Sequence, residues 1–229
     1  MKFTPPLPVK AVMIDLDGTL LDTIPDLAAA ANRMLTELDM PALPEVQIRN
    51  YVGKGIANLI ERTLTNSMDG KPGADLFQRA LPLYERAYRE VNGKHTTMYP
   101  GVKEGLDLLR AQGYPLACVT NKSERFTLPL LDYVKLSDYF VSVVAGDTLP
   151  QKKPDPAPLL HACRHMNVAP GEMLMIGDSI NDAQAARAAG CPVFCVTYGY
   201  NEGHDVQSLD VDAIVVSLVE ATRLISKKI

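Results

Sequence analysis

The sequence predicts an α/β protein with a doubly wound, mostly parallel sheet, a Rossmann-like core into which an all-helical cap is inserted. Two observations predict this fold. Short apolar runs alternate with stretches of helical periodicity, an order typical of a parallel sheet covered by helices on both faces. The alternation is interrupted once, by residues 23–98, a connection far longer than the dozen or so residues that a crossover needs.

The apolar runs are short and rich in aliphatic and β-branched residues, as expected of strands that are buried on both faces. They are Ala11–Ile14, Leu116–Val119, Val141–Ala145, Met173–Ile176, Val193–Val196 and Ala213–Val216. Helical periodicity is found in the same part of the chain at Val102–Gln112, Glu124–Tyr133, Ala157–Met166 and Ala183–Ala188. We therefore expect a core of about six strands with helices between them.

The long interruption looks helical throughout. Its first part has an apolar stripe with three- and four-residue spacings, the pattern of an amphipathic helix. The stripe contains Leu27, Ala30, Ala31, Met34, Leu35 and Leu38. Ile56–Leu64 and Leu76–Val91 continue the helical pattern, and clusters of Pro and Gly punctuate it. The sequence thus predicts an α/β catalytic core formed by residues 1–22 and 99–229, and a helical cap formed by residues 23–98.

Composition narrows the function classes. Hydrophobic residues make up 47% and charged residues 22%, which fits a globular protein rather than a disordered one. The net charge is −4, so there is no basic surplus for a nucleic-acid partner. No apolar run approaches the ~20 residues of a membrane span, and prolines interrupt the first residues too early for a signal peptide. We expect a cytoplasmic protein of undetermined oligomeric state with no membrane partner.

Cysteine and histidine, the other residue types that commonly bind metals, give only weak indications of a metal site. None of the four cysteines forms a C-x-x-C pair, so we expect buried, reduced thiols. His161 and His165 are four residues apart on one predicted helix. Such a pair can bind a metal, but we interpret it as part of a solvated helix face.

Polar residues follow four of the apolar runs. The segments are Asp15–Leu20, Thr120–Lys122, Lys152–Pro156 and Gly177–Asp182. Each segment alone is compatible with a helix cap or a plain loop. Ligands of open α/β sheets bind outside the carboxyl ends of the strands. Because acids and lysines are costly to bury unless they are paired or bind a metal, the four segments together predict one site.

The residue types point to phosphoryl transfer. Phosphate monoesters hydrolyse extremely slowly in water, and a carboxylate nucleophile divides the displacement into two easier steps. Asp15 is the candidate nucleophile. Asp17, two residues further on, is the candidate acid and base that protonates the leaving group and then activates water.

The remaining candidates would neutralise charge. Magnesium suits a site of carboxylates, substrate phosphate and water, and Asp178 is the natural additional ligand beside Asp15. Asp182, one helical turn further on, is placed to hold a metal-bound water or to orient Lys153. Lys153, Thr120 and the main-chain amides near Asn121 are expected to bind the phosphate oxygens.

These segments resemble, in order, the four motifs of the haloacid dehalogenase superfamily of phosphotransferases: Asp15-x-Asp17-Gly18-Thr19, Thr120-Asn121, Lys153-Pro154 and Gly177-Asp178-Ser179-x-x-Asp182. The resemblance covers about Val9 to Tyr200. It implies that Asp15 is the nucleophile and that Asp17 is the acid and base, whose main-chain carbonyl also binds magnesium. A dehalogenase proper is disfavoured, because it needs no second acid at position 17.

Further stretches resemble the phosphoglycolate phosphatases of that superfamily: Asp22–Asp26, Tyr51–Gly55, Lys152–Pro156 and Thr197–Asn201. This likeness implies hydrolysis of 2-phosphoglycolate, a small phosphorylated metabolite, to glycolate and phosphate. Leu16 replaces an aromatic residue that is common there, and we expect its side chain to point away from the chemistry.

Several alternatives stay open. The substrate of a phosphatase with these motifs could instead be a small phosphosugar or an aminosugar phosphate, and a phosphosugar mutase would use the same two aspartates. A non-catalytic binding module should lack at least one of Asp15, Asp17, Lys153 and Asp178, whereas all four are present.

Substrate selection is expected to come from the cap. Gly53-Lys54-Gly55 stands directly before the helical stretch that starts at Ile56, and the start of a helix attracts anions. We predict that this turn approaches the core and that Lys54 contacts the substrate carboxylate. The alternative is that the glycines only shape a turn and Lys54 is solvated.

Overall fold

The computed structural model describes residues 3–228 and confirms the predicted fold class. Its central sheet has six strands in the order β6-β5-β2-β7-β8-β9, and every neighbouring pair is parallel. The strands are β2 (Ala11–Ile14), β5 (Leu116–Val119), β6 (Phe140–Val144), β7 (Met173–Gly177), β8 (Val193–Val196) and β9 (Ala213–Val215). The six apolar runs are thus strands, with ends that differ from the prediction by one residue at most.

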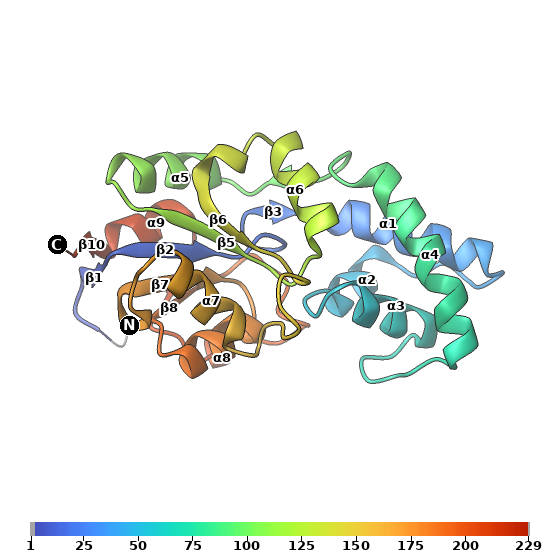
Figure 1. Cartoon of the computed structure of the whole chain (residues 1–229). Helices are drawn as coiled ribbons and strands as arrows, with labels where there is room; N and C mark the ends of the chain where they lie inside the picture. Colours follow the sequence, from blue (N-terminus) through green and yellow to red (C-terminus); the bar gives the residue numbers. More distant parts are fainter. Residues whose placement is uncertain (1–2, 229) are drawn as a thin grey trace.

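Helices cover both faces of this sheet (Figure 1). Residues of α5 (Val102–Ala111), α6 (Glu124–Tyr133) and α9 (Leu218–Arg223) belong to one hydrophobic cluster, and those of α7 (Ala157–His165) and α8 (Ile180–Ala189) to another. Along β2, Val12 and Ile14 contribute to the first cluster and Ala11 and Met13 to the second. Burial on both faces explains why this strand is an unbroken apolar run.

Four helices, α1 (Ile24–Glu37), α2 (Glu45–Tyr51), α3 (Ile56–Thr65) and α4 (Ala74–Val91), follow β2 in the chain and lie beside the sheet (Figure 1). They share a third hydrophobic cluster, in which Met34 of α1 and Tyr84 and Tyr88 of α4 are fully buried. Two short antiparallel strands, β3 (Leu21–Asp22) and β4 (Thr97–Met98), join the two ends of this segment. The last two residues of the predicted cap are therefore a strand, and the division into 1–22 plus 99–229 and 23–98 stays a prediction.

Some elements were not predicted. β1 (Leu7–Val9) pairs with β10 (Ile225–Lys227) in a small separate sheet, and α2 and α9 are also additional. Helix α8 begins at Ile180, earlier than the apolar pattern suggests. A capping box between Ser179 and Asp182 defines this start, because the two side chains satisfy main-chain N–H groups that have no partner within the helix.

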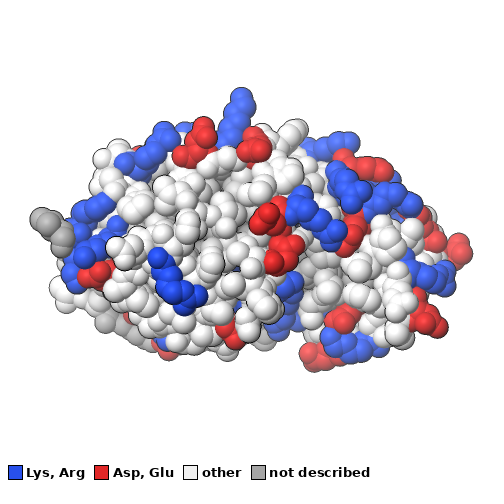
Figure 2. Space-filling model, in the orientation of Figure 1, with Lys and Arg blue, Asp and Glu red and all other residues white. Residues whose placement is uncertain are grey.

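The described residues include no helix that is long and apolar enough to cross a membrane. All four cysteines are free and buried. On the face in Figure 2, Lys and Arg side chains are interspersed with Asp and Glu. The absence of a nucleic-acid partner and the cytoplasmic location stay predictions.

Candidate active site

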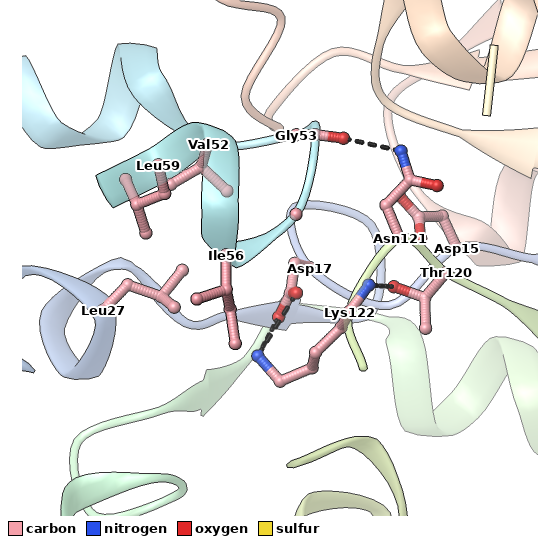
Figure 3. Close-up of a pocket in the computed structure, with 11 residues that line it drawn as sticks. Asp15, Asp17, Leu27, Val52, Gly53, Ile56, Leu59, Thr120, Asn121 and Lys122 are labelled. Carbon is pink, nitrogen blue, oxygen red and sulfur yellow. Dashed lines mark hydrogen bonds and ion pairs between the residues drawn. The ribbon is translucent and has the colours of Figure 1, made fainter. Parts of the chain in front are cut away.

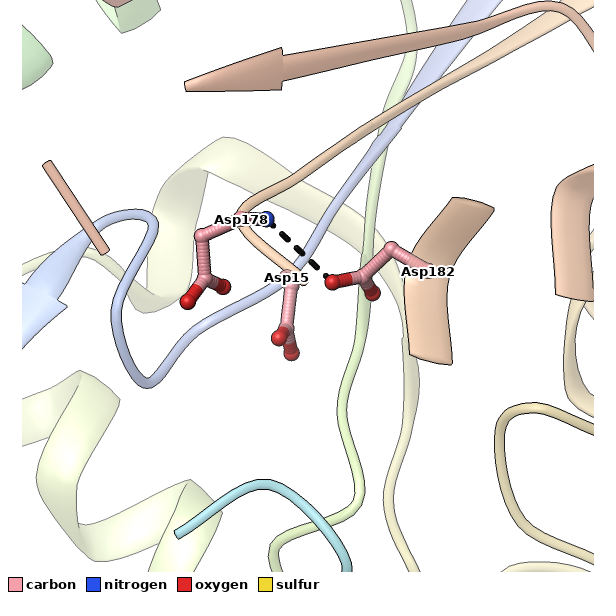
Figure 4. Close-up of side chains that lie close together, drawn as sticks. All are labelled: Asp15, Asp178 and Asp182. Atoms are coloured by element: carbon pink, nitrogen blue, oxygen red, sulfur yellow. Dashed lines mark hydrogen bonds between the residues drawn. The ribbon is translucent and has the colours of Figure 1, made fainter. Parts of the chain in front are cut away.

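The predicted site residues meet at the carboxyl edge of the sheet. Asp15 follows β2, Thr120 follows β5 and Asp178 follows β7, and β2 lies between β5 and β7. The chain runs from β2 toward β5 on one side and resumes at β7 on the other side, so this edge is the switch point where ligands of such sheets bind. Carboxylate oxygens of Asp15, Asp178 and Asp182 all lie within 4.8 Å of one another (Figure 4).

A tight turn follows Asp15 and brings the chain close to Asp178. Gly18 has a φ of +89°, and a Cβ atom at this position would lie 2.3 Å from Asp178 Oδ2. Only glycine adopts this conformation and this approach without strain. Leu16 is fully buried in the hydrophobic core, as expected of a side chain that takes no part in the chemistry.

Lys153 links two of the three acids. Its Nζ atom lies 2.9 Å from Asp15 Oδ1 and 2.7 Å from Asp182 Oδ1, and it donates to the main-chain oxygen of Val119 at 2.7 Å. Burial disfavours the charge of Lys153, but the carboxylates of Asp15 and Asp182 outweigh this cost and raise its pKa. The lysine is therefore a fixed positive charge beside Asp15.

Burial raises the pKa of Asp15 to about 7, although the charge of Lys153 lowers it. The pKa of Asp178 lies well above its ordinary value, first because of burial and then because Asp182 and Asp15 repel its charge. Asp15 Oδ1 is buried and accepts no hydrogen bond from the described residues, so its contact with Lys153 is an ion pair. A buried acceptor amid three crowded carboxylates fits a hard cation with oxygen ligands.

Asp182 differs from the other two acids because its oxygens are already engaged. Oδ1 accepts from Lys153 at 2.7 Å, and Oδ2 accepts from the main-chain N–H groups of Asp178 and Ser179, both at 3.2 Å, and from Ser179 Oγ at 2.9 Å. These bonds fix Lys153 and the start of α8. The geometry favours a supporting position for Asp182, as the sequence suggested, rather than direct metal ligation.

Asn121 connects the core to the cap (Figure 3). Its Nδ2 donates to the main-chain oxygens of Gly53 and Lys153, both at 2.8 Å, and its Oδ1 accepts from Lys153 N at 2.9 Å. Because the amide N–H groups and oxygen of this side chain already have partners, Asn121 could donate to a phosphate only through its main-chain N–H. Thr120 lies next to it, and its hydroxyl accepts from the N–H of Lys122 at 3.2 Å.

A pocket opens between these core residues and the cap (Figure 3). The core side of its lining is polar and the cap side is apolar with two glycines. The lining residues are Asp15, Asp17, Thr120, Asn121 and Lys122 from the core, and Leu27, Val52, Gly53, Gly55, Ile56 and Leu59 from the cap. The carboxyl groups proposed as nucleophile and as acid and base thus lie in one pocket, which the cap covers.

The structure places Lys54, the predicted substrate-binding lysine of the cap, and Lys122 differently. Lys54 Nζ lies 3.5 Å from Glu202 Oε2, and Lys54 is not among the described residues that line the pocket. Its predicted contact with substrate stays a prediction. Lys122, which the sequence marked only as part of a strand end, has its Nζ atom 3.2 Å from Asp17 Oδ1 inside the pocket. In the sequence, its position directly after Thr120-Asn121 was the one indication that Lys122 belongs to the site.

Comparison with known proteins defines the class of this chain. The family model for haloacid dehalogenase-like hydrolases matches residues 12–196, which include Lys153, Asp178, Asp182 and every residue that lines the pocket. The chain belongs to this family, and it is an enzyme with the phosphatase architecture of that family.

Individual relatives narrow the comparison. A phosphoglycolate phosphatase of Nitrosospira multiformis is 64% identical over 222 residues, which are 97% of this chain and 98% of the relative. A phosphoglycolate phosphatase of Thiobacillus denitrificans is 54% identical over the same shares of both chains. The crystal structure of a predicted phosphoglycolate phosphatase from Haemophilus somnus superposes with a TM-score of 0.88 at 33% identity, covering 93% of this chain and 96% of the other.

Proposed function

We propose that this enzyme hydrolyses 2-phosphoglycolate to glycolate and phosphate through an aspartyl-phosphate on Asp15, with Mg²⁺ as its cofactor. The observation that carries the chemistry is the setting of Asp15. Its carboxylate is buried at the end of β2, with Lys153 Nζ at 2.9 Å and the carboxylate of Asp178 close by. The relatives that are phosphoglycolate phosphatases match nearly the whole chain and support the choice of substrate.

The reaction has two displacements. A carboxylate oxygen of Asp15 attacks phosphorus, the bond to the ester oxygen breaks, and Asp17 donates a proton to the departing glycolate oxygen. Asp17 then takes a proton from water as the water oxygen attacks phosphorus, which breaks the bond to Asp15 and releases phosphate. Thr23 Oγ1 donates to Asp17 Oδ1 at 2.8 Å, which orients the acid for both steps.

The other residues neutralise charge around the phosphoryl group. Asp15, Asp178 and the main-chain carbonyl of Asp17 would hold Mg²⁺, which when bound removes the repulsion between the carboxylate and the phosphate. Lys153, the Thr120 hydroxyl and the N–H of Asn121 donate to the phosphate oxygens. Asp182 Oδ1 lies 2.7 Å from Lys153 Nζ and holds this lysine beside Asp15.

The test is phosphate release from 2-phosphoglycolate and from a panel of sugar and aminosugar phosphates, with and without magnesium. We expect 2-phosphoglycolate to have the highest kcat/KM, and chelation to abolish turnover until magnesium is added back. Asp15→Asn should be inactive yet folded, because an amide does not attack phosphorus, and Asp17→Asn should be severely impaired.

The alternatives make different predictions in the same assay. A higher kcat/KM for a sugar phosphate would make the enzyme a sugar phosphatase, and transfer of the phosphoryl group to sugar without release would make it a mutase. Turnover that survives exhaustive chelation, or wild-type activity of Asp15→Asn, would refute the mechanism.

A further inference from the structure

Lys122 is a buried lysine in the covered pocket (Figure 3), and its side chain is only 2% exposed. Its Nζ atom lies 3.2 Å and 3.3 Å from the two carboxylate oxygens of Asp17. It also donates to the hydroxyl of Tyr88 on α4 and lies 4.7 Å from the centre of that ring. A buried charge is costly unless it is paired, so these contacts fix the position of the ammonium group.

The surroundings of Lys122 favour an anion. Among the described residues that line the pocket, Lys122 is the only one with a positive charge. Helix α3 has ten residues, and Gly55 and Ile56 at its N-terminus also line the pocket. The first N–H groups of a helix have no partner within it and carry partial positive charge. The cap contributes Leu27, Val52 and Leu59 to the rest of the wall, and these side chains have no charge or hydrogen-bond donor for an anion.

The position of Lys122 relative to Asp17 decides which anion it can reach. This step rests on the proposed function. To protonate the leaving group, Asp17 must lie within about 2.6–3.2 Å of the ester oxygen. In 2-phosphoglycolate a single methylene separates that oxygen from the carboxylate, so the carboxylate lies next to Asp17 as well. Lys122 Nζ is 3.2 Å from Asp17, on the leaving-group side of the site.

We propose that Lys122 is a specificity-determining residue, whose ammonium group binds the carboxylate of the substrate while Asp17 and Tyr88 hold it in place. An ammonium group has three N–H donors. The Tyr88 hydroxyl takes one of them, and the two Asp17 oxygens, at nearly equal distances, share a second. The third remains for the substrate carboxylate. An uncharged leaving group of the same length offers this donor no matching anion.

The test compares two substrates of the same length, 2-phosphoglycolate and ethyl phosphate. In the Lys122→Met variant we expect the ratio of their kcat/KM values to fall by roughly 10- to 150-fold, the effect of one hydrogen bond to a charged group. Tyr88→Phe should lower the ratio less, because it removes only a support of the lysine. The comparison of substrates separates carboxylate binding from any effect on Asp17, which would act on both.

A second lysine provides a matched control. Lys103 Nζ lies 2.8 Å from an oxygen of Asp107 and also donates to the hydroxyl of Tyr139, the same partner types that Lys122 has. Its side chain is 56% exposed and lies outside the pocket. Lys103→Met should therefore leave kcat/KM unchanged for both substrates.

Each outcome decides between explanations. Equal losses on both substrates in Lys122→Met would overturn the proposal and leave Lys122 as a positioning residue for Asp17. If that variant does not fold, the wild-type enzyme still tests the idea, since it should prefer 2-phosphoglycolate by at least roughly tenfold. Comparable wild-type activity on both substrates would overturn carboxylate binding but not the phosphatase activity. Wild-type activity on neither would refute the proposed substrate itself.

Discussion

The buried carboxylates of the site should make the stability of the folded protein depend on pH and on bound metal. Burial raises the pKa of Asp15 to about 7 from 3.8. At pH values between these two pKa values, the metal-free folded protein keeps a proton that the unfolded chain has lost. The free energy of unfolding therefore falls as the pH rises. Between about pH 5 and pH 7 this group alone costs the metal-free protein about 2 kcal/mol, which lowers Tm by roughly 4–8 °C for a chain of this length.

Magnesium should reverse this trend. The ion binds the ionised carboxylates, so its affinity rises as Asp15 loses its proton. Thermal unfolding in EDTA and in excess magnesium, at several values between about pH 5 and pH 8, measures both effects. We expect the gain in Tm from magnesium to increase with pH.

The Asp15→Asn variant isolates the contribution of this carboxyl, because asparagine does not titrate. In EDTA, the difference in Tm between wild type and this variant should shift against the wild type as the pH rises. A difference that stays constant across the window, or a magnesium effect that is larger at low pH, would refute the reasoning that burial and crowding control the site.

Three further predictions concern single residues. Asp182→Asn should lower kcat/KM for 2-phosphoglycolate roughly 10- to 100-fold at saturating magnesium, because Lys153 loses a charged partner; an effect below about twofold would contradict this role. Asp26 is fully buried and accepts hydrogen bonds from three main-chain N–H groups between Gly93 and Thr96, so Asp26→Ala should cost about 3 kcal/mol in urea unfolding, and an unchanged midpoint would contradict it. Lys54→Ala should reduce kcat/KM for 2-phosphoglycolate roughly 5- to 150-fold more than for ethyl phosphate if Lys54 reads the carboxylate, and equal losses would refute that contact.

Most of the fold could be predicted because local pattern and tertiary burial agree. The run Ala11–Ile14 is a strand buried on both faces, and the stripe that includes Leu27 and Met34 is the buried side of α1. The small sheet of β1 and β10 could not be predicted, because the first strand is short and contains Pro8, and its partner lies at the other end of the chain. Nothing local specifies such a pairing.

The core of the candidate site could be predicted for a geometric reason. Parallel strands end at one edge of the sheet, so residues that directly follow β2, β5 and β7 must meet there. The carboxylates of Asp15, Asp178 and Asp182 accordingly lie within 4.8 Å of one another. Their separate tasks were harder to predict, because they depend on hydrogen bonds such as that from Ser179 Oγ to Asp182, at 2.9 Å.

Two lysines near the pocket show that the local sequence does not determine which residue contacts the substrate. Lys54 lies between two glycines before a helix, a context that favours anion binding, yet Glu202 from the loop after β8 lies 3.5 Å from its Nζ atom. The same glutamate accepts from buried Arg62 on α3. Lys122 instead pairs with Asp17, a residue of the site itself, and is held over Tyr88 within the pocket. Which lysine meets the substrate is thus decided by acids and aromatic rings that are distant in sequence, and the paired variants at positions 54 and 122 separate the two.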